Sequence, residues 1–302
     1  MSRSSLPFSS VLIYGMGMMG ASLAYALKKS DLFQGSIAGV VRGEKSAAFI
    51  RENGLAQEVY ATSLPGDSER LDPTRYDLIV IGLTIRSSVR LLGELPPVQC
   101  LITDMCSTRR EIEAAAVARP DLRFIGSHPM CGSEDSGPSS LREDLYGDKL
   151  CLLTPRPETP EEDVQLVGDL WRAVGMKTCV IEPEPHDEIL AYLSHAPHVI
   201  AGLLTNWALD NPSVARSIET TPMPVTGGGF KDMARIAGSN PEMWTDILET
   251  NRENLIIALE DFQNATEAAL DLLRDFKRDD WLDWFVRARR ARNTLCGYPE
   301  DA

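Results

Sequence analysis

The stretch Val11-Leu-Ile-Tyr-Gly-Met-Gly-Met-Met-Gly20 decides the fold class of this chain of 302 residues. Four apolar residues typical of a buried strand come first, and good helix formers follow the last glycine. In such a strand, turn and helix, Gly15 permits the tight turn, Gly17 admits a pyrophosphate to the backbone, and Gly20 lets the helix pack on the strand. The helix N-terminus then offers free N–H groups to phosphate. The stretch predicts a dinucleotide site, rather than a glycine-rich turn without function, formed by Gly15, Gly17, Met18, Met19 and Gly20.

The exit of the second expected strand favours NADP over NAD. Ser36–Gly43 reads as this strand and its end, where an NAD site usually offers Asp or Glu to the ribose hydroxyls. Here Val41 is followed by Arg42, so no acid would repel a 2′-phosphate. Arg42 can bind that phosphate bidentately, with Lys45 and Ser46 as helpers. The alternative is that Arg42 is a solvated loop cation, which leaves NAD open.

Short apolar runs alternate with helical patterns along the first part of the chain. Strands separated by helices predict βαβ units and a mostly parallel sheet, with ligands beyond the carboxyl ends of the strands. Two of these ends are followed by Thr103–Ser107 and Gly126–His128, which are therefore candidate site loops. The expected strands are Val11–Tyr14, Ile37–Val41, Leu78–Ile81, Leu101–Thr103, Phe124–Ile125, Leu150–Leu153 and Cys179–Ile181.

The pattern changes to helices after Pro183. Apolar residues recur at spacings of three and four over His186–Ala208 and again from Pro241 to about Leu295. Asn240 or Ser239 is expected to cap the second region, and a break is expected near Arg278 because the pattern exceeds globular helix lengths. We expect a doubly wound Rossmann-type α/β domain over residues 1–183, followed by an all-helical dimerisation domain over residues 184–302.

Composition limits the partners. The chain has 30 basic and 44 acidic residues, a net charge of −14, which disfavours nucleic acid and anionic membranes. No apolar run approaches the roughly 20 residues of a membrane span, and the N-terminus lacks a secretory signal, so a cytoplasmic protein is expected. The six cysteines form no C-x-x-C pair, and no metal site is expected.

Three of the four histidines lie in two short segments. His128 follows a strand end within Gly126-Ser-His-Pro-Met-Cys-Gly132, where a hydride-transfer enzyme would hold its base. His195 and His198 are three residues apart on one helix face, with Pro197 between them producing a kink. Each of these two could equally be a structural hydrogen-bonding residue. His186 could be no more than a residue at the start of a helix.

These motifs, taken in order, resemble the prephenate and arogenate dehydrogenases of tyrosine biosynthesis. The likeness extends from about residue 10 to about residue 255. It rests on Gly126–Gly137, Leu152–Pro155, Trp171, Gly175, Glu184–Asp187, Ser194–His198 and Gly227–Ala237.

The resemblance implies an oxidative decarboxylation, in which hydride leaves C4 of a cyclohexadienol for the nicotinamide while the ring carboxylate leaves as CO₂. His128 would take the proton of the C4 hydroxyl, and Ser107 would orient His128 and touch the nicotinamide. Arg235 would bind a substrate carboxylate, with Lys231 as a second cation. The resemblance further implies substrate contacts from His198 and His195, a gating or substrate-binding carboxylate at Glu134, and a homodimer of intertwined helical domains.

The chain departs from the family pattern in several places. Arg109 stands where the family commonly has Lys, and the usual proline is missing before Thr84, in the loop expected at the cofactor. No regulatory ACT domain is expected, so any feedback inhibition would act at the active site. Asp135 could select the ammonium group of arogenate over the keto group of prephenate, but the sequence leaves this choice open.

Two other classes of protein share some of these features. An NADP-linked dehydrogenase of the β-hydroxyacid type would have a similar first domain, but Gly227–Asp232 only partly imitates its catalytic lysine helix. A non-enzymatic protein that binds NADP would not need His128, Ser107 and Arg235 together. Turnover of prephenate or arogenate would exclude the β-hydroxyacid dehydrogenase. Turnover of any substrate would exclude the non-enzymatic protein.

Overall fold

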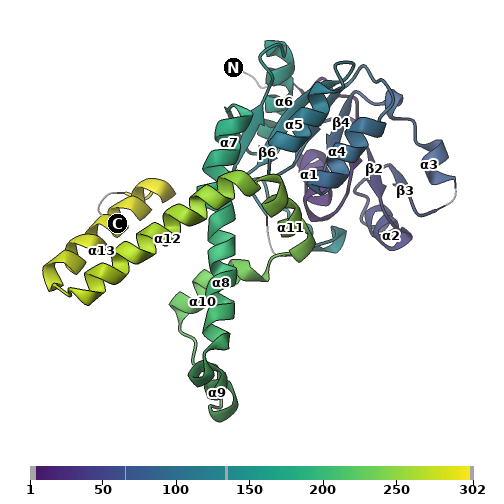
Figure 1. The fold of residues 1–302 in the computed structure, drawn as a ribbon. Coiled ribbons are helices and arrows are strands. Elements are labelled where there is room, and N and C mark those ends of the chain that lie inside the picture. The colour runs from purple at the N-terminus through teal and green to yellow at the C-terminus, as the bar shows by residue number, and fades with distance from the viewer. Residues whose placement is uncertain (1–4, 65, 133–134, 300–302) are drawn as a thin grey trace. The chain divides into compact units, whose positions relative to one another are not determined.

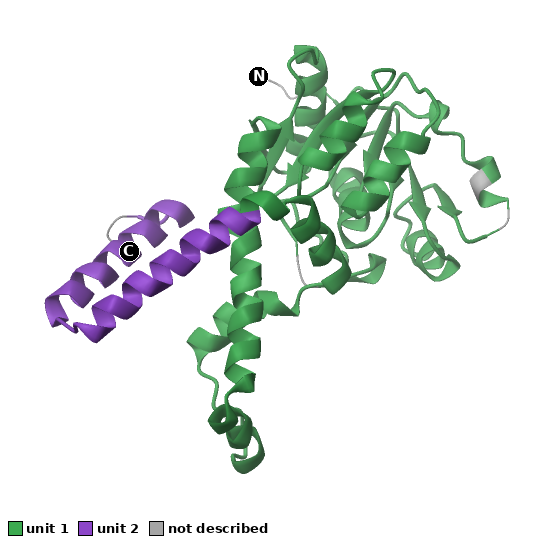
Figure 2. Ribbon diagram, viewed as in Figure 1, with its two compact units in different colours: residues 1–254 green, residues 255–302 purple. Residues whose placement is uncertain are grey.

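The computed structural model describes residues 5–64, 66–132 and 135–299. The chain divides into two compact units, residues 1–254 and 255–302 (Figure 2). This division by contacts differs from the expected boundary between residues 183 and 184. The expected boundary separates a dinucleotide-binding domain from a dimerisation domain, and it stays a prediction.

In the described part of the chain, eight strands form one sheet in the order β3-β2-β1-β4-β5-β6-β7-β8 (Figure 1). All neighbours are parallel except β6 and β7, which are antiparallel. The first six strands have the doubly wound order of dinucleotide-binding sheets, which confirms the expected fold class. The strands are β1 (Ser10–Tyr14), β2 (Ser36–Val41), β3 (Glu58–Ala61), β4 (Leu78–Ile81), β5 (Leu101–Asp104), β6 (Arg123–Pro129), β7 (Leu150–Thr154) and β8 (Lys177–Val180).

The central strands are buried on both faces. Along β1, Val11 and Ile13 belong to one apolar cluster, while Leu12 and Tyr14 belong to another. Alternate residues of a strand point to opposite faces, so a strand covered by helices on both sides reads as a continuous apolar run. All seven expected strands are present, and the central ones follow this pattern, whereas β8 is a largely exposed edge strand. The short edge strand β3 was not predicted. The covering helices are α1 (Met18–Lys29), α2 (Glu44–Glu52), α3 (Asp67–Arg70), α4 (Ile85–Glu94), α5 (Arg110–Val117) and α6 (Glu161–Ala173).

A long helix opens the helical part of the first unit. It comprises α7 (Pro183–Leu190), a π-helical turn (Ala191–His195) and α8 (Ala196–Asp210). In the π turn the N–H of Ala196 donates to the carbonyl of Ala191. The irregularity expected at Pro197 therefore lies one turn earlier, where the widened turn accommodates the missing proline donor. The remaining helices of this unit are α9 (Pro212–Thr220), α10 (Gly228–Ala234), a 3-10 turn (Arg235–Gly238) and α11 (Pro241–Thr250).

The long apolar pattern after Pro241 is broken twice rather than once. Asn240 caps α11 by accepting from the N–H of Met243 at 3.0 Å, as expected. Asn251 ends that helix, α12 runs over Arg252–Arg274, and α13 runs over Arg278–Cys296. The second break thus precedes the expected position by a few residues.

The second unit contains most of α12 and all of α13. Trp281 of α13 donates through its Nε1 to the carbonyl of Leu272 at 3.3 Å, which ties the two helices into a hairpin. Trp281, Trp284 and Phe285 form an aromatic cluster on this hairpin, with ring centroids 5.0 to 6.0 Å apart. Among the helices of the described residues, none is both long and apolar enough to cross a membrane.

Candidate active site

The turn between β1 and α1 has the shape of a pyrophosphate cradle. Gly15 has a φ of +84°, and a Cβ there would collide with the carbonyl oxygen of Gly82. A Cβ on Gly20 would collide with the carbonyl oxygen of Gly15, whereas one on Gly17 would have no atom within 4 Å. The backbone is thus tightly packed at two glycines and open at the third, where α1 presents its first N–H groups. These residues fit a dinucleotide at the positions expected from the sequence.

The other expected cofactor residues lie at two places. Thr84 precedes α4 and, together with Gly17, Met18 and Met19, lines a cavity at the carboxyl ends of the strands. Arg42 is exposed at the end of β2 and Ser46 is half-buried in α2. Neither Arg42 nor Ser46 lines the cavity. This position beyond β2 is where the ribose of a dinucleotide would lie.

A cavity of about 580 Å³ opens at the carboxyl ends of β1, β4, β5 and β6. It brings together His128, Ser107, His195, His198 and Arg235, which come from four separate segments of the sequence. Glu134, expected as a gating carboxylate, lies outside the described residues.

Lys231 does not join this group. It is exposed in the last turn of α10 and does not line the cavity. Arg235 is the first residue of the 3-10 turn that follows α10, and it does line the cavity. The turn leads directly into Ser239 and Asn240, which also line the cavity. The expectation of a second substrate cation at Lys231 therefore gains no support from the cavity lining and stays a prediction.

Buried side chains hold His128 from behind. Its Nδ1 lies 2.9 Å from Nε2 of His186, and Nδ1 of His186 lies 2.8 Å from Oδ1 of Asp187. The Asp187 carboxylate also accepts from the backbone N–H groups of Arg109 at 2.8 Å and Arg110 at 2.9 Å, at the start of α5. His128, His186 and Asp187 are 7%, 0% and 3% exposed. The three side chains form one continuous buried chain.

This arrangement corrects two expectations. The orienting hydrogen bond to His128 was expected from Ser107, but His186 occupies Nδ1 of His128, and Ser107 lines the cavity instead. His186 does lie at the start of α7, yet its ring is fully buried rather than a surface helix-start residue. The neighbouring pair His186 and Asp187 was the available signal, since a carboxylate beside a histidine can orient its ring.

Burial keeps the cavity histidines neutral. It lowers the pKa of His128 well below 6.5, and positive charge on His186 and Arg109 would lower it further. Burial lowers the pKa of His195 to about 4, and it also lowers that of His198, where the nearby Arg235 adds to the effect. A general base is most effective with a pKa near the working pH, but the interior lowers the pKa of His128. A neutral His128 is ready to accept a proton.

Trp244 of α11 holds the second histidine pair. His198 stacks on its ring, with centroids 3.6 Å apart and planes at 22°, and His195 meets it edge-on at 6.0 Å. Nδ1 of His198 donates to the carbonyl of Ser194 at 2.9 Å, and Nδ1 of His195 lies 3.0 Å from Nδ2 of Asn251. Trp244 and Asn251 were not identified from the sequence, because nothing local indicates that α11 reaches the cavity.

A buried ion network lies beneath the site. Arg109 is completely buried and donates to both oxygens of Asp104, at 2.8 and 3.0 Å, and to Glu113 at 3.1 Å. Asp104 also accepts from the N–H of Ser127 at 2.9 Å, which joins the ends of β5 and β6. A Cβ on Gly126 would collide with this guanidinium. Arg109 is the cation expected at this position, but it serves the interior rather than the cavity.

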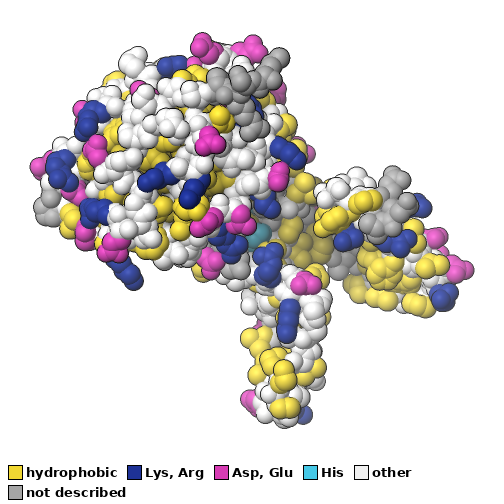
Figure 3. Space-filling view, turned by 180° about the vertical axis from the view of Figure 1, so that it is seen from behind, with side chains coloured by type: hydrophobic (Ala, Val, Ile, Leu, Met, Phe, Trp, Pro, Cys, Tyr) yellow, Lys and Arg dark blue, Asp and Glu magenta, His cyan; other side chains and the backbone are white. Residues whose placement is uncertain are grey.

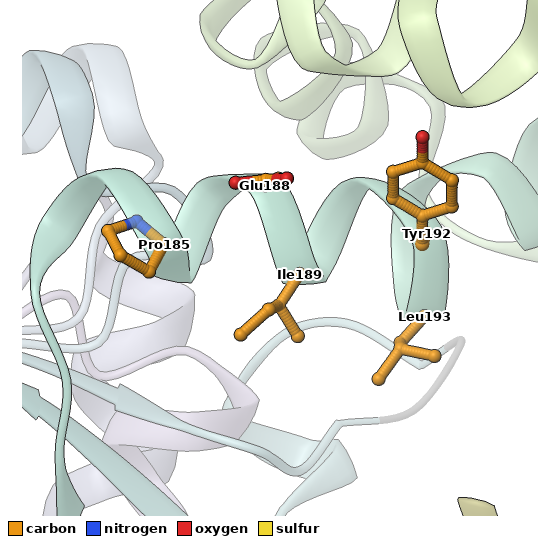
Figure 4. A pocket seen from close by; sticks show the side chains of 5 residues that line it. All are labelled: Pro185, Glu188, Ile189, Tyr192 and Leu193. Atoms are coloured by element: carbon orange, nitrogen blue, oxygen red, sulfur yellow. The ribbon is translucent and has the colours of Figure 1, made fainter.

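A second, shallow pocket of about 360 Å³ lies along α7 and the π turn. Pro185, Glu188, Ile189, Tyr192 and Leu193 line it, and Ile189 and Leu193 point to the same side (Figure 4). Its lining is mostly apolar, and Glu188 and Tyr192 are the polar side chains in it. It is an apolar surface feature and not a second catalytic site.

Comparisons with known proteins agree with this geometry. Residues 23–180 match the family model described as the nucleotide-binding domain of prephenate dehydrogenase, and residues 182–287 match its dimerization domain. The prephenate dehydrogenase of Bacillus subtilis (strain 168) is 25% identical over 291 residues, which cover 94% of this chain and 76% of that protein. The cyclohexadienyl dehydrogenase of Zymomonas mobilis is 27% identical over 295 residues, covering 95% and 96%.

Solved structures give the same result. The prephenate dehydrogenase from Aquifex aeolicus in complex with hydroxyphenyl propionate and NAD+ superposes with a TM-score of 0.82 at 28% identity. The match covers 98% of this chain and all of that one, at 100%. Synechocystis arogenate dehydrogenase, at 22% identity and a TM-score of 0.75 over 95% of this chain and 99% of that chain, shares the fold.

Proposed function

This chain belongs to the prephenate dehydrogenase family, and from that premise we propose that it oxidatively decarboxylates prephenate or arogenate. The observation that carries the proposal is a buried, neutral His128 in the same cavity as the glycine turn of the dinucleotide site. A nicotinamide dinucleotide held at the turn of Gly15, Gly17 and Gly20 would supply the hydride acceptor for C4 of the substrate ring. The C4 hydroxyl loses its proton to His128 as the carbonyl forms, and the electrons of the broken carboxylate bond make the ring aromatic.

The remaining cavity residues would position the substrate. Arg235 supplies a positive charge for a substrate carboxylate, which is needed in a protein of net charge −14. Ser107 follows β5 and would contact the nicotinamide or the reacting hydroxyl. His195 and His198 would lie along the substrate side chain, on the wall formed with Trp244.

Turnover tests the proposed function. Purified protein should release CO₂ and reduce a nicotinamide dinucleotide when given prephenate or arogenate. Absence of reduction with both substrates and both dinucleotides would contradict the activity. The same assay decides between the substrates. Asp135 lines the cavity and would favour the ammonium group of arogenate, although Arg142 at 3.2 Å offsets part of its charge.

We infer that NADP is the preferred dinucleotide, because Arg42 is exposed beyond β2 where an acidic residue would otherwise bind the ribose. Arg42→Ala should raise KM for NADP at least tenfold and change KM for NAD little, since a charge-assisted phosphate contact contributes about 1.5–3 kcal/mol. Steady-state kinetics with both cofactors measure this. Arg90→Ala, which removes an exposed arginine from α4, is the matched control. Equal losses for NADP and NAD in Arg42→Ala would show that Arg42 does not read the 2′-phosphate.

We also infer a homodimer formed through the helices after Pro183. Large apolar side chains are exposed there, including Leu203 and Trp207 of α8 and Phe285 of α13, at 59%, 72% and 61%. Figure 3 shows such side chains gathered on the arm of α8 to α10 and, separately, on the hairpin of the second unit. Exposed apolar area costs about 25 cal/mol per Å². Light scattering should give about twice the monomer mass of 33.3 kDa, and a monomer mass unchanged by tenfold concentration would contradict the dimer.

A further inference from the structure

The ring of His186 lies between the proposed base and a carboxylate anchored in the α/β part of the first unit. We propose that His186 and Asp187 are positioning residues that hold the proton of His128 on Nδ1 and leave its Nε2 as the acceptor for the substrate. The proposal deepens the proposed function and rests on it, because it takes His128 as the base of that reaction.

The direction of the hydrogen bonds follows from Asp187. Its ionised carboxylate can only accept, so the contact at 2.8 Å requires a proton on Nδ1 of His186. Neutral His186 then has its lone pair on Nε2, and the contact at 2.9 Å requires the proton of His128 to lie on Nδ1. The Nε2 of His128 is the atom left to accept a proton. Through His186, the Asp187 carboxylate therefore determines the tautomer of His128, although the two side chains are not in contact.

Asp187 is fixed independently of the histidines. Its two oxygens accept from the N–H groups of Arg109 and Arg110, at the positive end of the α5 dipole. These contacts hold α7 against the start of α5. They also share the carboxylate lone pairs among several donors. The start of α5 therefore sets the ring orientation in the cavity.

The main-chain carbonyl of Asp187, and not its carboxylate, also determines which ring nitrogen of His195 carries the proton, because it orients the amide of Asn251. The Asn251 amide donates to the Asp187 carbonyl at 2.7 Å, and its Oδ1 accepts from Asn254 at 2.9 Å, so its Nδ2 is the donor. Nδ1 of His195, 3.0 Å from that Nδ2, must accept, and neutral His195 then carries its proton on Nε2. His128 and His195 thus hold opposite tautomers, one an acceptor and one a donor at Nε2. A substrate hydroxyl could donate to Nε2 of His128, and a substrate oxygen could accept from Nε2 of His195.

The chain of contacts also assists the proton transfer. When Nε2 of His128 takes the hydroxyl proton, the ring becomes an imidazolium that still donates from Nδ1 to His186. The carboxylate of Asp187 lies behind that neutral ring and stabilises the new positive charge. The O–H bond of the C4 hydroxyl breaks as the N–H bond on Nε2 forms, and the proton returns to the C4 oxygen once loss of CO₂ has made the ring a phenolate, which leaves His128 neutral again.

Two variants test the proposal in the full-length protein. His186→Leu removes the link at similar volume, and Asp187→Asn allows the amide to donate to His186 and reverse both tautomers. Each should lower kcat by roughly 10²-fold or more while KM for the substrate stays within about threefold, as expected when a base is held in the wrong tautomer. Thr250→Val is the control, because it removes a comparable buried hydrogen bond to Thr108 at 2.8 Å. It should keep kcat near that of the unchanged protein.

Nitrogen-15 NMR of the histidine rings reads the tautomers directly and does not depend on turnover. With four histidines in the chain, single substitutions assign the signals. We expect His128 protonated on Nδ1 and His195 on Nε2 in the unchanged protein, and His128 protonated on Nε2 in Asp187→Asn. A proton on Nε2 of His128 in the unchanged protein, or wild-type kcat in folded His186→Leu, would overturn the proposal. If neither substrate is turned over, the proposed function fails, and the NMR result still decides the tautomers.

Discussion

Replacing His128 by Asn is expected to lower kcat by roughly 10²- to 10⁴-fold with little change in substrate affinity. An Asn side chain can still contact His186 and nearly fills the site, but it cannot accept the proton of the substrate hydroxyl. The loss therefore falls on the transition state and not on binding. Steady-state kinetics measure it, with circular dichroism to show that the variant is folded. A kcat near that of the unchanged protein would remove His128 from the mechanism.

The pH dependence of the same variant adds a second test. Burial lowers the pKa of His128 below 6.5, and positive charge on His186 of α7, Arg109 before α5 and His195 of the π turn would lower it further. The base is therefore neutral at pH 7 and becomes protonated only in acid. We expect kcat of the unchanged protein to stay level as pH falls to 6.5 and to decline below it, and the residual rate of His128→Asn to lack this decline.

Replacing Arg109 by Met is expected to destabilise the protein by about 3–5 kcal/mol. The substitution leaves the buried carboxylates of Asp104 and Glu113 without their cation. Burial already raises the pKa of Glu113, which can therefore take a proton when Arg109 is lost. A raised carboxyl pKa favours the folded state at low pH, so the loss of stability should be larger above neutral pH than in mild acid. Urea unfolding at both pH values measures it.

Arg123→Met is the matched control for this prediction. Arg123 pairs with Asp163 at 2.6 Å, but its side chain is half exposed. Asp163 is buried, but solvent reaches the Arg123 end of the pair, so removal of Arg123 should cost less than removal of the fully buried Arg109. Arg109→Lys keeps the charge and loses the two-pronged contact with Asp104, so its effect should lie between the two. If Arg109→Met were no more harmful than Arg123→Met, the network would be unimportant for stability.

The sequence was sufficient where structure depends on neighbours along the chain. The apolar runs of β1, β4 and β5 and the spacing of Gly15, Gly17 and Gly20 predicted the sheet and its dinucleotide turn. Asn240 as a helix cap followed from the chemistry of one side chain and the backbone beside it. The strand β3 was missed because Glu58–Ala61 is a short edge element, with no continuous apolar run of the kind the central strands show.

Candidate site residues could be named from the sequence, but their partners could not. His128, Ser107, His195, His198 and Arg235 were expected at a site, and the cavity brings them together. Lys231 was named on the same grounds and lies outside the cavity, because one turn of helix separates it from Arg235 and the backbone changes its course between them. Proximity along a helix does not determine which side chain reaches a distant strand.

The sequence alone therefore determined the fold class, the dinucleotide turn and the identity of the three histidines that line the cavity. Only the tertiary structure decided which atom of His128 is left to act as the base. That choice depends on His186, Asp187 and the first N–H groups of α5, which lie about 60 and 20 residues from His128 along the chain. A hydrogen bond can fix the position of a proton only on a group that it contacts. Asp187 contacts the first N–H groups of α5 only when α7 packs against the start of that helix.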